Sequence, residues 1–201
     1  VRPLLNSMRR LITHLLIDGI SLIDGGVDSL ICGDETAAGS FIEEAISLAA
    51  LAALNEVPVR ILGCTGLGAE LDIAYAHILE NIAALTALGA FFGVCSLVRS
   101  MPAYQAYEEA VLFVQSQPLQ HASIINSSIV SAVRDQHGGY HLIPKTHSST
   151  LLISPLMALY ANTDRFGSAQ LALTYAYWNC PNDRHAVSHC LEAAGDRSIP
   201  P

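Results

Sequence analysis

A short apolar run that ends in an acidic, glycine-bent loop constrains this chain more than any other feature. The apolar run covers residues 20–23, and the loop that follows carries four carboxylates and no basic residue: Asp24, Asp28, Asp34 and Glu35. Glycines permit positive φ and let the backbone approach a ligand closely. An acidic loop of this kind is typical of a ligand site at the carboxyl end of a buried strand.

We therefore predict that this loop binds a ligand. Asp24 and Asp28 are the expected catalytic carboxylates and the expected ligands of a divalent metal such as Mg²⁺, because hard divalent cations prefer oxygen donors. The remaining contacts to the ligand are expected from Gly25, Gly26, Ser29, Gly33, Asp34 and Glu35. The structural alternative is that Asp28 and Asp34 cap local turns and helix starts.

The charge distribution limits what this loop can bind. The chain has a net charge of −8, and between Leu11 and Val98 its only Lys or Arg is Arg60, whereas eleven of the eighteen acids fall in that span. A nucleic-acid backbone needs clustered Lys and Arg, so no nucleic-acid partner is expected. A bare phosphate would be repelled, and a metal ion, a metal–phosphate complex or an amine would be attracted.

Strand and helix patterns alternate three times along the chain. Apolar strands are predicted at 20–23, 59–62 and 90–97, and helices at 4–17, 41–54, 71–88, 102–115 and 124–134. This alternation is typical of a parallel sheet flanked by helices, in which ligands bind outside the carboxyl ends of the strands. Short strands are expected at 140–143 and 151–153, and a helix is expected to start at 155–160.

The length of the chain, its cysteines and its hydropathy predict the domain organisation and the cellular compartment. We expect one α/β domain over residues 1–201, with 161–201 as a helical extension. The five cysteines form no disulfide ladder, which favours a reducing cytoplasm, and Cys64 and Cys95 are expected to be buried. The uncharged run at 82–98 is divided by Gly89, so no membrane span is predicted. A zinc site at Cys180, His185, His189 and Cys190 is less favoured than a solvated terminal helix.

Three further groups of residues are candidates for the site. Gly66 and Gly68 follow the second strand, where a turn either holds a ligand or only packs tightly. His77, Glu80 and Asn81 lie on one helix. His77 and Glu80 are an expected catalytic acid–base pair, and Asn81 is an expected ligand contact. The alternative is a buried polar cluster that orients Asn126 or the neighbouring loop. A helix entrance offers the last candidates for ligand binding, unless they only cap the helix: Asn126, Ser127 and Ser128.

Four blocks of this sequence resemble the DUF1152 family, a family of unknown function. They are the loop at 24–35 with Gly39, the segments at 66–68 and 79–85, the segment at 125–130 and the segment at 153–157. The resemblance implies a Rossmann-like α/β fold in which a glycine-rich amino-terminal third precedes Val1. We therefore expect a fragment of a larger three-layer domain that bares an edge or face of its sheet and forms a homo-oligomer.

Two functions are consistent with these patterns. The first is a cytoplasmic enzyme that acts on a small polar metabolite at an acidic, metal-dependent site. The alternative is a non-catalytic metabolite-binding or assembly protein that uses the same site.

Overall fold

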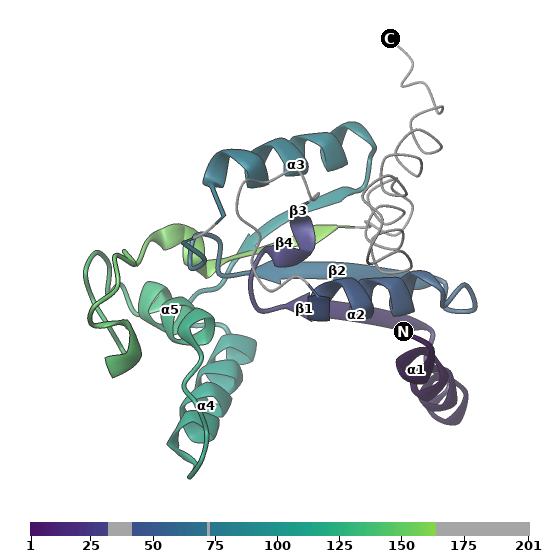
Figure 1. The fold of residues 1–201 in the computed structure, drawn as a ribbon, viewed down its shortest axis with the longest axis horizontal. Coiled ribbons are helices and arrows are strands. Elements are labelled where there is room, and N and C mark those ends of the chain that lie inside the picture. Colours follow the sequence, from purple (N-terminus) through teal and green to yellow (C-terminus); the bar gives the residue numbers. More distant parts are fainter. Residues whose placement is uncertain (32–41, 72, 164–201) are drawn as a thin grey trace, which may run out of the picture.

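The computed structural model describes residues 1–31, 42–71 and 73–163 (Figure 1). The helices, 3₁₀ turns and strands follow in this order: α1 (Arg2–Leu15), β1 (Gly19–Asp24), η1 (Asp28–Leu30), α2 (Ile42–Ala52), β2 (Val59–Thr65), α3 (Tyr75–Ala87), β3 (Phe91–Ser96), α4 (Pro102–Ser116), α5 (Ile124–Val133), η2 (Pro144–Thr146), η3 (Pro155–Ala158) and β4 (Leu159–Thr163). The α/β class predicted from the alternation of strands and helices is confirmed.

The strands form one sheet in the order β1-β2-β4-β3. β1 and β2 pair in parallel, whereas β4 is antiparallel to both β2 and β3. β1, β2 and β3 therefore run in the same direction, as predicted. β4, which was not predicted as a strand, lies between β2 and β3 and makes the sheet mixed.

β4 was expected to be part of a helix that starts at Pro155. The proline begins only the 3₁₀ turn η3, and the chain then becomes extended and enters the sheet. Gly63 of β2 makes room for this strand, since a Cβ there would lie 2.5 Å from the hydroxyl oxygen of Tyr160. Of the predicted helical extension at 161–201, residues 161–163 belong to β4 and the rest lies outside the described residues.

Other boundaries differ from the predictions in smaller ways. β2 continues to Thr65, three residues past its expected end, and α3 begins at Tyr75 rather than at 71. The segments at 140–143 and 151–153 form no ladder, only one antiparallel bridge between Gly138 and Ile153. Cys64 is buried as predicted, but Cys95 is exposed, because it lies on the edge strand β3.

The main core lies between one face of the sheet and the helices α2 and α3. Leu62 and Cys64 of β2 pack there with Leu48 of α2 and with Ile78 and Leu85 of α3. On β1, residues 20, 22 and 24 are half-buried while residues 19, 21 and 23 are exposed. This other face leaves Ile23 52% and Val59 51% exposed within the described part of the chain. A third layer over that face, and the expected oligomer, stay predictions.

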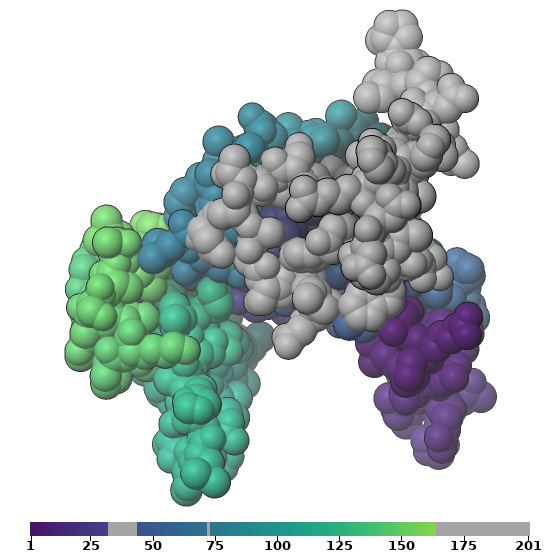
Figure 2. Space-filling view, in the orientation of Figure 1, coloured from purple at the N-terminus to yellow at the C-terminus, as the bar shows by residue number. Residues whose placement is uncertain are grey.

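A second core joins α4 and α5 to η3. It contains Tyr104 of α4, Ala132 and Val133 of α5, and Met157 and Ala158 of η3. Figure 1 shows α4 and α5 at one end of the sheet and α1 at the other, and Figure 2 shows α1 and α4 as separate projections. Among the helices that the structure describes, none combines the length and apolarity needed to cross a membrane.

Candidate functional site: an acidic cleft at the end of β1

Asp24 is the last residue of β1 and lies opposite Cys64 of β2 in the parallel register. Its Oδ2 accepts two hydrogen bonds from Ser29, one from the backbone N–H at 2.9 Å and one from the hydroxyl at 2.6 Å. The main-chain oxygen of Asp24 also accepts a hydrogen bond from Oγ1 of Thr65 at 3.2 Å. The loop after β1 therefore turns back on Asp24 and fixes its carboxylate at the carboxyl end of the strand.

A cleft of about 230 Å³ opens beside this carboxylate. Its described lining comes from the end of β1, the loop after it and the helix α2: Leu22, Ile23, Asp24, Gly25, Ser29, Glu44 and Ser47. The cleft thus has two carboxylates, two hydroxyls and an apolar wall. Three of the predicted site residues, Asp24, Gly25 and Ser29, line it.

Sequence reasoning missed Glu44 and Ser47. The two residues are three positions apart on α2, so they share one side of the helix. A helix whose few polar residues lie in its first half, after the acidic loop, was the available signal. Only the packing of α2 against β1 shows that this pair faces Asp24 across a cleft.

Two distant side chains hold the loop between Asp24 and η1. Oε2 of Glu70 accepts a hydrogen bond from the N–H of Val27 at 2.8 Å, and a Cβ on Gly26 would collide with the Glu70 carboxylate. Nδ2 of Asn81 donates to the carbonyl oxygen of Leu30 at 2.9 Å. A side chain at position 26 would displace the Glu70 carboxylate that accepts from Val27. Asn81 holds the end of η1, which agrees with the alternative that its helix orients the neighbouring loop.

Asp28 begins the 3₁₀ turn η1 and is only 6% exposed. It is not among the residues that line the cleft, and its role as a metal ligand stays a prediction. Within the described ranges no three His, Cys, Asp or Glu side chains come together as a ligand set for a metal ion. The predicted contacts of Gly33, Asp34 and Glu35, and the zinc candidates at 180–190, lie outside the described residues.

Arg60, the only Lys or Arg between Leu11 and Val98, is held away from the cleft. Arg60 pairs with Ile20 in the sheet, four positions before the pair Asp24–Cys64, which is about 13 Å along the strand. Its guanidinium donates to the carbonyl oxygens of Leu51 and Ala52 at the end of α2, at 3.4 and 2.9 Å. The Arg60 charge therefore stabilises the carboxyl end of α2 rather than neutralising Asp24.

The turn at Gly66 and Gly68 is explained by packing. Both glycines have positive φ, of 71° and 87°. A Cβ on Gly66 would lie 2.7 Å from Cγ2 of Ile125 in α5, and a Cβ on Gly68 would collide with the hydroxyl of Tyr75. Of the two interpretations of this turn, the structure supports tight packing. Neither glycine lines the cleft.

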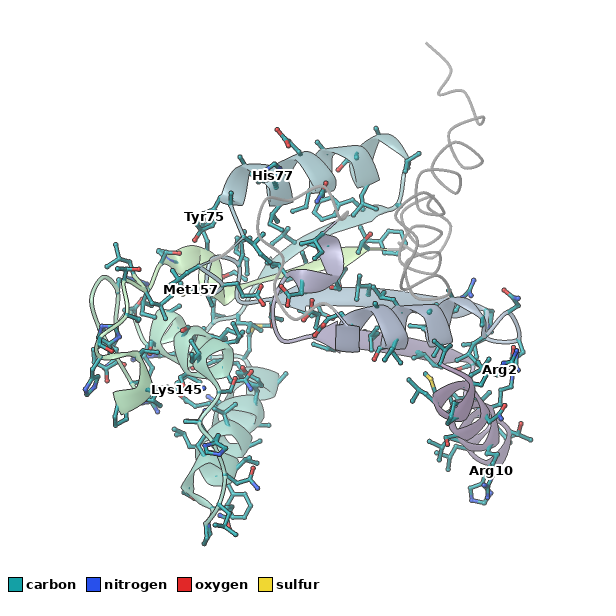
Figure 3. The ribbon with its side chains drawn as sticks, viewed as in Figure 1. Arg2, Arg10, Tyr75, His77, Lys145 and Met157 are labelled. Carbon is teal, nitrogen blue, oxygen red and sulfur yellow. The ribbon has the colours of Figure 1, made fainter. Side chains whose placement is uncertain are left out.

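His77 and Glu80 lie together but outside the cleft. Nδ1 of His77 is 3.5 Å from Oε2 of Glu80, and their side chains are 39% and 74% exposed. Figure 3 shows His77 near Tyr75 at the amino-terminal end of α3. The two residues are within ion-pair distance, but they are not part of the described cleft lining, and their catalytic role stays a prediction.

The residues Asn126, Ser127 and Ser128 lie inside α5 rather than at its entrance. Ser123 is the N-cap, and its Oγ accepts a hydrogen bond from the N–H of Asn126 at 3.2 Å. Oγ of Ser128 donates to the carbonyl oxygen of Ile124 at 2.8 Å, and Ser127 pairs with Gln115 of α4 at 3.2 Å.

Asn126 also joins the two helices. Its Oδ1 accepts a hydrogen bond from the hydroxyl of Tyr107 at 2.9 Å, and burial raises the pKa of Tyr107 to about 12. The polar groups of this part of α5 therefore hold α4 and α5 together. None of the three residues predicted to bind a ligand here lines the cleft at Asp24.

These features together define an α/β protein with an acidic cleft at the carboxyl end of a sheet strand. Residues 1–163 match the family model described as "Protein of unknown function (DUF1152)", and the chain belongs to this family. The resemblance found in the four sequence blocks is thereby confirmed. The comparisons with curated proteins and with solved structures gave no match.

Proposed function

We propose that this protein is an enzyme that binds a small polar metabolite together with a divalent cation such as Mg²⁺ in the cleft beside Asp24. The observation that carries the proposal is the placement of two carboxylates, Asp24 and Glu44, on one cleft at the end of β1. Ligands of α/β sheets bind outside the carboxyl ends of the strands. A cation between the two acids would offset their mutual repulsion.

The number of carboxylates favours a cation that arrives with its metabolite. Mg²⁺ keeps several waters and is commonly bound by one or two carboxylates together with substrate phosphates. Asp24 and Glu44 supply that number, while Ser29 and Ser47 add hydroxyls for the metabolite. A phosphate without its metal would meet negative charge, because Arg60 is held at the far end of β2.

The size of the cleft supports a small ligand. Its volume of about 230 Å³ lies below the roughly 300–1,000 Å³ typical of sites for drug-sized molecules. Leu22, which lies on the same face of β1 as Asp24, provides a short apolar wall beside the acids. We infer a compact metabolite with one apolar side and a phosphate or another metal-binding group.

One observation favours a second candidate function, in which the protein binds the metabolite without transforming it. The expected acid–base pair, His77 and Glu80, is solvent-exposed and absent from the described lining of the cleft. A metabolite-binding or assembly protein would need only the anchored carboxylate and the cleft. Turnover of the bound ligand distinguishes the two functions.

We further propose a cytoplasmic location and a homo-oligomer. The location is supported by the thiols Cys64 and Cys95, which form no disulfide in the described chain. The oligomer is supported by the exposed sheet face at Ile23 and Val59.

The metal part of the proposal is tested by thermal unfolding of the chelator-treated protein during titration with Mg²⁺ or Mn²⁺. A ligand that binds only the native state stabilises it by about 2.7 kcal/mol at a concentration about 100 times its Kd, which corresponds to a rise in Tm of roughly 5–10 °C for a chain of this size. Asp24→Asn, alone and with Asp28→Asn, should abolish this rise. The fold should stay intact without metal, since Asn keeps an oxygen that accepts hydrogen bonds from Ser29.

Asp18→Asn is the matched control, because Asp18 is an exposed carboxylate just before β1, at the opposite end of the strand. It should leave the metal-dependent rise in Tm unchanged. A wild-type protein whose Tm does not respond to either metal, or a response that persists in Asp24→Asn alone or with Asp28→Asn, would contradict the proposal.

A further inference from the structure

Cys64 is joined to the cleft carboxylate through one intervening hydroxyl. Its side chain is buried, with 2% of the residue exposed, in the strand next to Asp24. Sγ of Cys64 lies 3.2 Å from Oγ of Ser29, and the same Oγ lies 2.6 Å from Oδ2 of Asp24. Three side chains from β1, η1 and β2 thus form one continuous chain of contacts.

The direction of the hydrogen bonds between these three side chains follows from the Asp24 carboxylate at one end of the series. An ionised carboxylate only accepts hydrogen bonds, and a serine hydroxyl has a single hydrogen to donate. Ser29 therefore gives its hydrogen to Oδ2 of Asp24, which leaves its oxygen as the acceptor toward Cys64. The Cys64 thiol is then the donor, and the order is Cys64 S–H to Ser29 O–H to Asp24.

We propose that Cys64 is a positioning residue of the cation site, acting on Asp24 through Ser29. By donating to the Ser29 oxygen, the thiol orients the Ser29 hydroxyl so that the hydroxyl hydrogen points toward Oδ2 of Asp24. Asp24 is then held through Oδ2, and its other carboxylate oxygen is kept for a cation. This inference rests on the proposed function, since it supposes that Asp24 binds a cation.

The size of the expected effect follows from comparable supporting groups. Residues that orient a metal ligand commonly change metal affinity by about 10–100-fold when removed. A thiol is a weak donor, so we expect the lower end of this range, about tenfold. A serine in place of Cys64 also donates a hydrogen bond and should restore most of the lost affinity.

The test compares Mn²⁺ binding, followed by electron paramagnetic resonance, in the full chain and in its Cys64→Ala, Cys64→Ser and Cys95→Ala variants. Cys64→Ala should raise the Kd for Mn²⁺ about tenfold, and Cys64→Ser should bind nearly as the wild type does. Cys95→Ala is the matched control, because Cys95 is an exposed thiol on the edge strand β3, and it should have no effect.

A spectroscopic measurement follows the hydrogen bond itself. The infrared S–H stretching band of Cys64, identified as the band lost in Cys64→Ala, should shift when Mn²⁺ is added. The same band should move toward the frequency of an unbonded thiol in Ser29→Ala. If Cys64→Ala does not fold, the band is identified from Cys64→Ser, and the Ser29→Ala result decides the inference.

The outcomes separate this inference from the proposed function. If the wild type binds Mn²⁺ and Cys64→Ala binds it equally well, or if the S–H band does not respond to Ser29→Ala, the positioning role is overturned while the cation site stands. If Cys64→Ala and Cys64→Ser lose affinity to the same extent, only the packing of the thiol matters and the inference also fails. A wild type that binds no Mn²⁺ overturns both.

Discussion

Replacing Gly66 by alanine tests whether the glycine turn after β2 is present for packing. Gly66 has φ of 71°, and an added Cβ would lie 2.7 Å from Cγ2 of Ile125, roughly 0.8 Å short of a normal carbon–carbon contact. The left-handed conformation costs a non-glycine residue about 1–2 kcal/mol, and overpacking adds about 1–3 kcal/mol. We therefore expect Gly66→Ala to lower the free energy of unfolding by about 2–5 kcal/mol.

Gly89→Ala provides the matched control. Gly89 has nearly the same φ, 67°, but its Cβ would meet no atom within 4 Å, so only the conformational cost of about 1–2 kcal/mol applies. Urea unfolding followed by far-UV circular dichroism measures both variants. In an Ile125→Ala background, Gly66→Ala should cost less than it does in the wild type, because the smaller side chain leaves room for the new methyl group. This difference is the recovery expected of the double variant.

Equal losses in Gly66→Ala and Gly89→Ala would refute the packing argument. The absence of any recovery in the double variant would refute it as well. A ligand contact would then be the remaining reason for a glycine at this turn.

The link between α4 and α5 gives two further predictions. Glu108→Ala should lower the free energy of unfolding by about 2–3 kcal/mol, because Oε1 of Glu108 accepts hydrogen bonds from the buried Tyr104 hydroxyl at 3.1 Å and from Nε of Arg134 at 2.6 Å. Alanine at the exposed neighbour Glu109 should change it by no more than about 0.5 kcal/mol. Equal losses in the two variants, measured by urea unfolding, would contradict this prediction. Burial raises the pKa of Tyr107 to about 12 from the value near 10 of an unfolded tyrosine. Between about pH 10 and 12 the folded state therefore keeps the Tyr107 proton that the unfolded state has lost. The free energy of unfolding should fall as the pH rises through this range. Tyr107→Phe should make that fall shallower in unfolding experiments across this pH range, and an unchanged slope would argue against the burial of Tyr107.

The sequence by itself determined the elements that local pattern controls. Apolar runs and helical spacing predicted β1, β2, β3 and the helices between them, because hydrophobic periodicity is a property of neighbouring residues. The same reasoning placed Asp24 at the end of the first strand and a glycine turn after the second. These features needed no knowledge of which strands pair.

Only the tertiary structure decided what surrounds Asp24. Glu44 reaches the cleft because α2 packs beside β1, and Cys64 reaches Ser29 across 35 positions of sequence. Glu70 and Asn81 hold the loop across 43 and 51 positions. No periodicity links residues so far apart. Loop orientation was therefore only an alternative role for Asn81, and no role was assigned to Glu44 or Glu70.

The position of β4 shows the same limit at the level of topology. A proline followed by apolar residues is compatible with the start of a helix or with a turn into a strand, and the local sequence at Pro155 does not separate them. The free energy that selects the strand comes from hydrogen bonds to β2 and β3, which lie about 70–100 positions earlier in the chain. The choice therefore depends on partners that exist only once the rest of the sheet has formed.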